Sequence, residues 1–412
     1  MSPLVKRVLL GNALSAIGSG LTMPLLIVYL TQVRGLETTV AGLAVAYMAV
    51  LSLLILPVTG ISVDRLGPRP VLIVGLVVEA AGVALLTQVT SVGSAFAVAT
   101  VLAVGGSFVW SPQAALLGRL TTPETRQRVF GIQFMLLNLG IGIGGIVAAV
   151  VVDVAEPGSF TLLYLADAMT YLLYVAVLVT MPGVGVGPAP TEEGAPADGG
   201  GYREVLRDRT LLRIVTLGLV LLTCGYGSLE VGLPVVITIV NGLSVSWVAV
   251  AFTVNTMTIV VMQMLVLRLI QGRSRSRMMA LVAALWGLSW LILGITGVLP
   301  SSLAIVGICL STLVFAVGET LWSPIVPALI NDLAPEHLRG RYNSVLSLVW
   351  GVSNALGPAL AGVMLGAGLM GGWVAVVVGG CLVAGLLALR LRHHLTPALD
   401  GRSVEISGTM RP

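Results

Sequence analysis

The sequence of 412 residues is strongly apolar, because 57% of its residues are hydrophobic and only 10% are charged. A soluble domain carries about 25% charged residues, so this composition excludes a soluble protein of this length. Apolar runs near or above about 18 residues recur along the chain, which predicts a polytopic α-helical membrane protein. The net charge of +4 comes from the segments between these runs, where it suits an acidic membrane surface and not nucleic acid.

Twelve membrane-spanning helices are predicted. The first apolar run begins near Val8 and has no small-residue cleavage site after it, so it is interpreted as the first span and not as a cleavable signal. The loops are short except for residues 182–210, a polar segment rich in Gly and Pro that divides the chain into six spans plus six. The end of this segment, Tyr202 to Arg213, is predicted to form a short amphipathic helix. The expected spans are 8–31, 39–61, 70–90, 94–118, 129–152, 160–181, 212–239, 246–267, 277–298, 301–330, 342–366 and 370–390.

The basic residues sort to one side of this arrangement. With the N-terminus in the cytoplasm, 21 of the 22 Lys and Arg residues fall in inside loops or tails, and only Arg34 falls outside. The positive-inside rule therefore predicts that both termini are cytoplasmic. The predicted parts are an N-terminal six-helix bundle (1–181), a cytoplasmic linker (182–210), a C-terminal six-helix bundle (211–392) and a cytoplasmic tail (393–412).

The two halves repeat each other. Each contains a Trp-Ser-Pro sequence, then Pro-Glu, then Arg-x-Arg at the start of a Gly-rich span, which is the kind of repeat that parallel halves of secondary transporters show. The two Trp side chains occupy equivalent positions on spans 4 and 10, where they either line a cavity or pack beside the prolines. The matched residues are Trp110, Ser111, Pro112, Pro123, Glu124, Arg126 and Arg128 in the first half, and Trp322, Ser323, Pro324, Pro335, Glu336, Arg339 and Arg341 in the second.

A short polar turn separates spans 2 and 3. Its glycines allow close backbone approach, and the prolines that follow end one helix and begin the next. The turn matches the signature G-x-x-x-D-R-x-G-R-[RK], so the sequence resembles the major facilitator superfamily. The resemblance implies an all-α membrane protein with twelve helices in two pseudo-symmetric six-helix bundles. The matching residues are Gly60, Asp64, Arg65, Gly67 and Arg69, and Pro68 departs where a basic residue is usual.

The same resemblance implies a conformational latch. In the superfamily the counterpart of Asp64 lies against the start of span 11, where the helix dipole attracts an anion. We therefore expect Asp64, Arg65 and Arg69 to contact the start of span 11, which carries Arg339 and Arg341. The latch would close the cytoplasmic side in the outward-open state and would release when that side opens.

Span 5 carries four glycines, Gly131, Gly140, Gly144 and Gly145. The first three have the spacing of the signature of the superfamily's antiporters, whereas Gly145 stands where that signature has proline. One interpretation is a pliable, leak-tight seam between the two halves of an exporter. The alternative is ordinary packing of small residues in a chain with 50 glycines.

Four acidic residues fall within predicted spans: Glu79, Asp167, Glu230 and Glu319. A charge in the middle of the bilayer costs about 2.5–3.5 kcal/mol, and no Lys or Arg lies deep in any span to offset it. These carboxyl groups must carry a proton, face water or meet a cation. In the superfamily spans 1, 4, 7 and 10 line the central cavity, which makes Glu230 and Glu319 the best candidates for proton or cation binding, with Tyr226 beside them. For Asp167 and Glu79 the alternative is helix–helix hydrogen bonding.

The sequence has no phosphate-binding P-loop and no cluster with metal-ligand spacing. We therefore expect no cofactor, no metal and no enzymatic activity, with transport driven by a gradient. Within the superfamily the chain is similar to drug:proton antiporters of the bacterial plasma membrane. This implies a monomer in membrane lipid that uses protons to export lipophilic small molecules or drugs by alternating access. The alternatives are a proton-coupled uptake symporter for a small polar metabolite and a non-transporting membrane sensor or scaffold.

Overall fold

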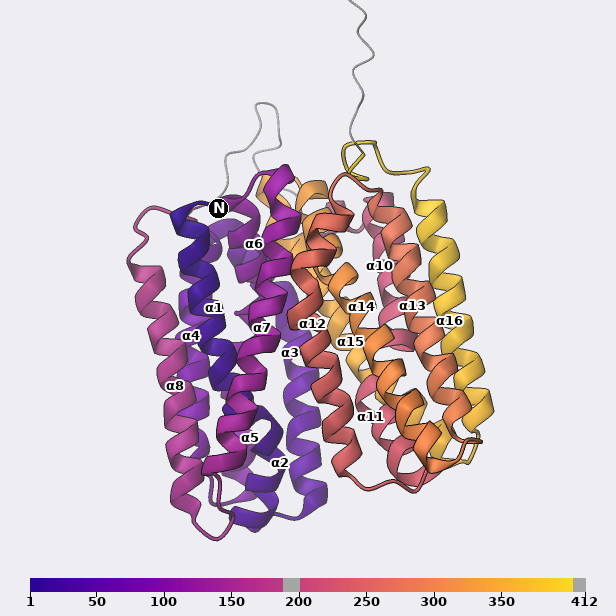
Figure 1. The fold of residues 1–412 in the computed structure, drawn as a ribbon. Coiled ribbons are helices and arrows are strands. Elements are labelled where there is room, and N and C mark those ends of the chain that lie inside the picture. The colour runs from indigo at the N-terminus through magenta and orange to yellow at the C-terminus, as the bar shows by residue number, and fades with distance from the viewer. Residues whose placement is uncertain (188–200, 403–412) are drawn as a thin grey trace, which may run out of the picture. The chain divides into compact units, whose positions relative to one another are not determined.

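A computed structural model describes residues 1–187 and 201–402, and these form helices joined by turns and loops (Figure 1). Within this part of the chain, twelve helical segments are long and apolar enough to cross a membrane, as the sequence predicts. Residues 188–200 of the predicted linker and 403–412 of the predicted tail lie outside the described residues. The spans are Pro3–Val33, Thr38–Leu66, Pro68–Leu86, Val92–Leu120, Pro123–Val151, Pro157–Val179, Arg209–Val240, Ser246–Ile270, Arg275–Thr296, Ser301–Leu333, Glu336–Gly366 and Met370–Leu391.

The first of two compact units consists of Met1–Val205 together with Ala334–Val352. Its long helices are α1 (Pro3–Thr22), α3 (Thr38–Leu66), α4 (Pro68–Leu86), α5 (Val92–Ser107), α6 (Trp110–Leu120), α7 (Pro123–Val151), α8 (Pro157–Val179) and the first part of α15 (Arg339–Gly366). Inside this unit α1 packs against α7 and α8, while α4 packs against α5 and α8.

The second unit consists of Leu206–Leu333 and the described part of Ser353–Pro412. Besides the rest of α15, its helices are α10 (Arg209–Leu221), α11 (Leu229–Val235), α12 (Ser246–Ile270), α13 (Arg275–Thr296), α14 (Ser301–Leu333) and α16 (Met370–Leu391). Here α13 packs against α14 and α16, α12 packs against α14, and α10 packs against α16. The division of the sequence at residues 181 and 211 stays a prediction.

The first span of each half is broken in a similar way. In the first span, α1 is followed by a 3₁₀ turn (η1, Met23–Leu25), a short α2 (Leu26–Val28) and a π-helical turn (η2, Tyr29–Val33). The seventh span contains two π-helical turns, η3 (Leu222–Tyr226) and η4 (Val236–Val240). Pro24 and Pro234 lack the N–H that a regular helix needs, so each interrupts the ladder of backbone hydrogen bonds.

The segment that follows the last helix of each unit folds back onto a loop of its own unit, and we call these segments the closing straps (180–187 and 392–402). In the first unit the backbone N–H of Arg69 donates to the Gly185 carbonyl at 3.1 Å, and the N–H of Gly187 donates to Leu66. In the second unit the N–H of Arg275 donates to the Asp400 carbonyl at 2.8 Å. The two straps therefore bind the starts of α4 and α13, which are the third helices of their halves.

The predicted amphipathic helix from Tyr202 to Arg213 is wrong. The chain forms a four-residue helix, α9 (Tyr202–Val205), and then starts α10 at Arg209. The Asp208 side chain causes the break, because it accepts hydrogen bonds from the N–H groups of Thr210 at 2.8 Å and Leu211 at 3.1 Å. A carboxylate in this position caps a new helix and ends the old one.

Candidate functional site

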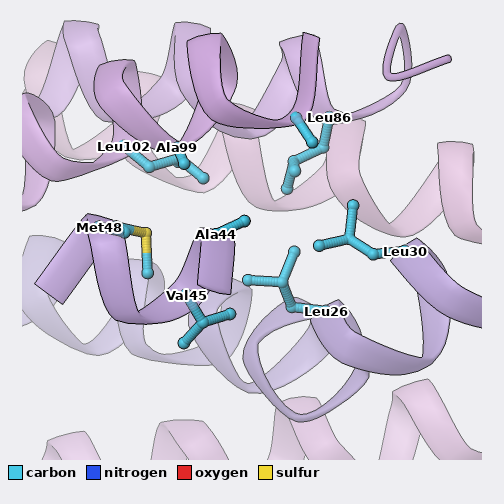
Figure 2. Close-up of a pocket in the computed structure, with 9 residues that line it drawn as sticks. Leu26, Leu30, Ala44, Val45, Met48, Leu86, Ala99 and Leu102 are labelled. Atoms are coloured by element: carbon cyan, nitrogen blue, oxygen red, sulfur yellow. The ribbon is translucent and has the colours of Figure 1, made fainter. Parts of the chain in front are cut away.

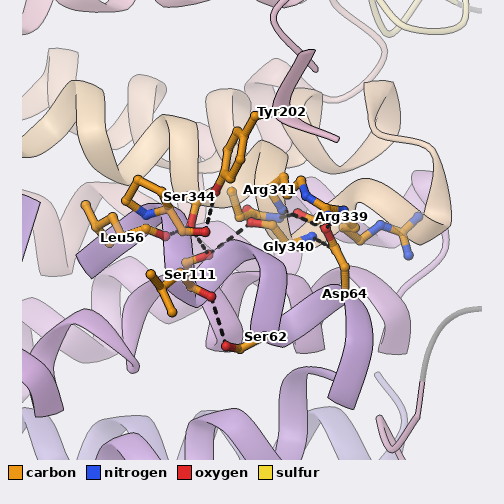
Figure 3. A network of polar contacts seen from close by, with 12 residues as sticks. Leu56, Ser62, Asp64, Ser111, Tyr202, Arg339, Gly340, Arg341 and Ser344 are labelled. Carbon is orange, nitrogen blue, oxygen red and sulfur yellow. Dashed lines mark hydrogen bonds and ion pairs between the residues drawn. The ribbon is translucent and has the colours of Figure 1, made fainter. Parts of the chain in front are cut away.

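Asp64 lies against the first turn of α15, inside the first unit (Figure 3). Its Oδ1 accepts from the backbone N–H of Gly340 at 2.6 Å, and its Oδ2 accepts from the Arg341 guanidinium at 2.9 Å. The N–H of Arg341 adds a longer bond of 3.3 Å to Oδ2. Asp64 is 6% exposed. Its carboxylate lies at the start of α15, where the free N–H groups and the positive end of the helix dipole stabilise a negative charge.

Two glycines make this contact possible. A Cβ on Gly340 would lie 2.6 Å from the Asp64 Oδ1 and 2.6 Å from the Gly60 carbonyl oxygen. A Cβ on Gly60 would lie 2.5 Å from the Tyr202 hydroxyl and 2.9 Å from the Arg341 Cα. Helices α3 and α15 can cross this closely only because both positions lack a side chain. The sequence signature marked Gly60 but gave no sign of Gly340.

Hydroxyl groups extend the contact along α3 (Figure 3). Ser344 donates to the Leu56 carbonyl at 2.6 Å, and Tyr202 donates to the Pro57 carbonyl at 2.9 Å. Ser111, at the start of α6, donates to the Gly340 carbonyl at 3.3 Å. Burial raises the pKa of Tyr202 to about 12, so its hydroxyl keeps its proton at neutral pH and remains a donor. None of these partners was predicted.

The other predicted members of the latch differ in their surroundings, and Arg339 lies at the start of α15 beside Gly340 (Figure 3). Arg65 is exposed near the end of α3, and its expected contact with span 11 stays a prediction. Arg69 turns to the end of α8, where its Nε donates to the Leu178 carbonyl at 2.8 Å, so its expected contact with span 11 is wrong. Arg339 has an ion pair of 3.7 Å with Glu336, which is 61% exposed at its side chain. Gly67 ends α3 with φ of +89°, a conformation that favours glycine.

Arg69 is drawn to α8 for an electrostatic reason. The last carbonyl groups of a helix have no partner inside the helix and carry partial negative charge, so they attract a guanidinium. Its Nη2 adds a bond of 3.3 Å to the Val179 carbonyl. A sequence signature shows which residue types occur, but it does not show which of two helix ends an arginine reaches.

Glu319 is a deeply buried acid within a span of the second unit. It lies within α14, is 3% exposed, and its Oε2 accepts from the Asn255 amide on α12 at 2.5 Å. In the described part of the chain no Lys or Arg forms an ion pair with it. The next residues of the same helix include Trp322, which is 2% exposed and packs on Trp286 at 6.1 Å between ring centroids.

Glu230 differs from Glu319, because it is exposed on the short helix α11. Tyr226 connects their surroundings, because it lies four residues before Glu230, and its ring packs near Phe315, which lies four residues before Glu319. The Tyr226 ring lies 6.1 Å from those of Trp286 and Phe315, so an aromatic cluster borders this region. Trp110, the counterpart of Trp322 in the repeat, is 51% exposed, and the two are therefore in different surroundings.

Asp167 and Glu79 form a second acidic region, inside the first unit. Asp167 is fully buried and accepts from Thr22 at 2.6 Å. A Cβ on Gly18 would lie 2.2 Å from its Oδ1, so α1 passes directly over the carboxyl group. Glu79 lies close enough to Asp167 for the two charges to interact, and its Oε2 has no hydrogen-bond partner among the described residues. The sequence singled out both acids but gave no sign that they lie close together.

The glycines of span 5 pack against α1. A Cβ on Gly144 would lie 2.1 Å from the Ile17 carbonyl oxygen, and one on Gly140 would lie 2.7 Å from the Ala16 Cβ. Gly145 faces away from α1, because a Cβ on it would lie 4.0 Å from the Gly20 carbonyl oxygen. Gly131 is buried near the start of α7. These contacts lie within the first unit, and the predicted seam between the halves stays a prediction.

A buried polar chain links α8, α6 and α1 in the first unit. The Tyr174 hydroxyl donates to the Gln113 side-chain oxygen at 2.9 Å, and the Gln113 amide donates to the Asn12 side-chain oxygen at 2.7 Å. Gln113 and Tyr174 were missed, because the sequence pattern weighs charge and repeat matches and gives little weight to neutral polar residues.

An apolar pocket lies among the short helix α2, α3, α4 and α5 (Figure 2). Its volume is about 20 Å³, and every side chain that lines it is apolar, including Leu26, Met48 and Leu102. A space of this size could hold one water molecule, but a buried water needs two to four polar partners. The pocket therefore has no means of binding an ion or a polar substrate.

The chain matches one protein-family model and several bacterial transporters. Residues 8–358 and 242–407 match the protein-family model described as Major Facilitator Superfamily. The chain is 23% identical over 365 residues to the uncharacterized MFS-type transporter YttB of Bacillus subtilis, covering 88% of each chain. It is 26% identical over 250 residues to the multidrug resistance protein MdtH of Yersinia enterocolitica, covering 58% of each chain.

Solved structures give the same fold. A bacterial homologue of the iron transporter ferroportin matches with a TM-score of 0.81 at 14% identity, covering 95% of this chain and 100% of that one. The fucose:proton symporter FucP of E. coli matches with a TM-score of 0.69 at 13% identity, covering 94% of this chain and 98% of that one. At these identities the likeness shows a shared fold and nothing of the substrate.

Proposed function

The chain belongs to the major facilitator superfamily, and from this premise we propose that it is a proton-coupled transporter that exports lipophilic small molecules by alternating access. Its twelve spans make it a multi-pass membrane protein, and its relatives are bacterial transporters. Export is supported by the likeness to a protein named for multidrug resistance. We further propose that the protein works as a monomer in the plasma membrane with both termini in the cytoplasm.

The observation that carries the proposal is the position of Glu319. Its carboxyl group is buried within a span, beside one amide and away from any described basic side chain. A charged side chain in mid-membrane costs about 2.5–3.5 kcal/mol, and this cost disappears when the group carries a proton. A carboxyl group in such a place can hold a proton while closed off from water and release it when water enters.

Coupling of export to proton entry then follows from competition between substrate and proton for binding. Glu230 is exposed on α11, and Tyr226 lies four residues before it on the same span. A substrate that binds beside Tyr226, whose ring packs on the buried Trp286 and Phe315, favours the loss of the proton, and a returning proton favours the release of substrate. Aromatic and apolar surroundings suit a lipophilic molecule, and a cationic one would also gain from the carboxylates.

The proposal is tested in proteoliposomes with an internal pH indicator and a panel of lipophilic cations. We expect the wild type to move protons only when substrate is added. The Glu319→Gln variant should lose at least about ten-fold of this coupled proton flux, a range typical for removing an essential proton carrier. It should keep substrate exchange in the absence of a gradient, because its amide imitates the protonated acid.

Glu156→Gln, at an exposed acid next to α8, is the matched control and should behave as the wild type. If Glu319→Gln and Glu230→Gln both keep full coupling, the assignment of the proton site is wrong. Substrate accumulation driven inward by the proton gradient would favour the uptake symporter instead. No substrate-dependent proton flux with any compound would favour the non-transporting alternative.

A further inference from the structure

A groove lies between the first turns of α10 and the last turns of α16, within the second unit. Its volume is about 280 Å³, close to the lower end of the range of about 300–1,000 Å³ for ligand pockets. Its lining combines three leucines, three basic side chains and Thr216. The leucines are Leu212, Leu387 and Leu391, and the basic residues are Arg213, Arg390 and His394.

The groove lies at the membrane boundary. The span that contains α10 begins at Arg209, and the span of α16 ends at Leu391, so the groove occupies the same end of both spans. On α16, Leu387, Arg390 and Leu391 lie three and four residues apart and therefore share one helix face. Leu387 lies about one turn deeper in its span than Arg390, while Leu212 and Leu391 lie beside the two arginines in sequence, at the span ends.

The arginines of this groove differ from three other arginines that lie near the ends of spans. Arg69 binds helix carbonyl groups, and Arg275 and Arg341 form ion pairs of 2.6 Å and 2.9 Å with acids. Arg213 and Arg390 are exposed, and within residues 1–187 and 201–402 no side-chain partner binds them. These two guanidinium groups therefore remain available for an external ligand.

The charges nearby in the sequence do not neutralise them. The residues that flank the groove in the chain include Arg209 and Arg392, which add positive charge. The neighbouring acid, Asp208, is occupied by the N–H groups of Thr210 and Leu211, whose helix it caps. The groove is thus a cationic site with an apolar floor.

We propose that this groove binds an anionic phospholipid, with the phosphate between Arg213 and Arg390 and an acyl chain along the leucines. A guanidinium binds phosphate oxygens in a forked, charge-assisted geometry, which favours an anionic headgroup over a zwitterionic one. Basic pockets between spans are known to hold such headgroups. The leucine floor favours a lipid over a free phosphate ion, which would gain nothing from apolar contact.

The test is native mass spectrometry of the full-length protein in detergent, titrated with dioleoyl-phosphatidylglycerol or dioleoyl-phosphatidylcholine. We expect one phosphatidylglycerol to bind more tightly than phosphatidylcholine. Each basic residue near a membrane surface adds to the free energy of binding an anionic lipid. The Arg213→Gln/Arg390→Gln variant, which lacks two of them, should therefore bind this lipid about 30-fold more weakly. The matched control is Arg273→Gln/Arg277→Gln, which removes two exposed arginines of the same unit and should keep the wild-type affinity.

Two further experiments distinguish a lipid headgroup from free phosphate, and apolar contact from charge attraction. Inorganic phosphate, added alone, should neither bind nor displace the lipid, and a Leu387→Asn variant should weaken lipid binding without a change in charge. The proposal fails if both double variants lose affinity equally, because the attraction would then be diffuse. It also fails if the two lipids bind alike, or if inorganic phosphate displaces phosphatidylglycerol, because the groove would then be a site for free anions.

Discussion

The carboxylate of Asp64 combines two attractions that usually occur apart. It accepts from the backbone N–H of Gly340 at a helix start, and it also forms a buried ion pair with the Arg341 guanidinium. The repeat makes the arrangement informative, because Arg128 is the counterpart of Arg341 in the first half and is exposed. The same residue type thus occupies equivalent positions in the repeat, buried and paired at one and exposed at the other.

This difference predicts unequal costs for one substitution. Arg341→Gln leaves the buried Asp64 carboxylate without its counter-ion, and breaking a buried pair typically costs about 3–5 kcal/mol. Arg128→Gln removes an exposed side chain and should change the free energy of unfolding by no more than about 0.5 kcal/mol. Denaturant unfolding in mixed micelles, followed by tryptophan fluorescence, measures both. Equal losses in the two variants would show that the ion pair contributes little.

At the scale of elements, helices α1 and α7 approach so closely that backbone meets backbone. A Cβ on Gly20 of α1 would lie 2.4 Å from the Ile141 carbonyl oxygen, and one on Gly144 of α7 would lie 2.1 Å from that of Ile17. Close approach of this kind lets small residues and backbone atoms replace the side-chain packing that holds helices together in membranes. The spacing of the glycines therefore has a structural reason inside one unit, whatever role it has in transport.

Adjacent glycines of α7 provide the test. Gly144→Ala puts a methyl group into the α1 backbone, and overpacking of this kind costs about 1–3 kcal/mol. Gly145→Ala meets no atom closer than 4.0 Å and gains helix propensity of up to about 1 kcal/mol. We expect the temperature at which detergent-solubilised protein loses its monodisperse peak to fall for Gly144→Ala and to hold or rise for Gly145→Ala. A fall of the same size in both would contradict the packing geometry.

The elements were predictable to the extent that they depend on local chemistry. Long apolar runs predicted the twelve spans, and the prolines after the turn between spans 2 and 3 predicted a helix start there, which lies at Pro68. Asp64 could be predicted from a signature, but its partner Gly340, the turn of Arg69 to α8 and the closeness of Glu79 to Asp167 depend on which helices pack together. These contacts join residues far apart in the chain, and a pattern within one segment contains no information about them.

At the scale of the whole molecule, the distribution of basic residues predicts how the chain crosses the membrane. Arg34 stands apart from the other 21 Lys and Arg residues on the expected outer side. Its guanidinium donates to the Tyr29 hydroxyl at 2.7 Å and lies over the Tyr29 ring, 5.1 Å from its centroid. An arginine held in this way has a local partner on that side, so it does not contradict the orientation that the other basic residues favour.

Single cysteines test this orientation in a variant whose three native cysteines, Cys224, Cys309 and Cys381, are replaced by serine. We expect a membrane-impermeant maleimide to label Glu37→Cys in intact cells, because residue 37 follows the first span on the outer side. Ser2→Cys should react only after the cells are permeabilised, which also serves as the control for reactivity. Labelling of Ser2→Cys in intact cells would place the N-terminus outside and reverse the topology.

The closing straps determine where the gene can be divided and where a tag can be added. The strap of each half makes its own backbone contact, Gly185 with Arg69 in one and Asp400 with Arg275 in the other. A gene divided within the codons of residues 188–200 would leave the strap of residues 180–187 on the first product and the strap of residues 392–402 on the second. An affinity tag joined directly to α16, by contrast, would delete the second strap, so fusions belong after residue 402.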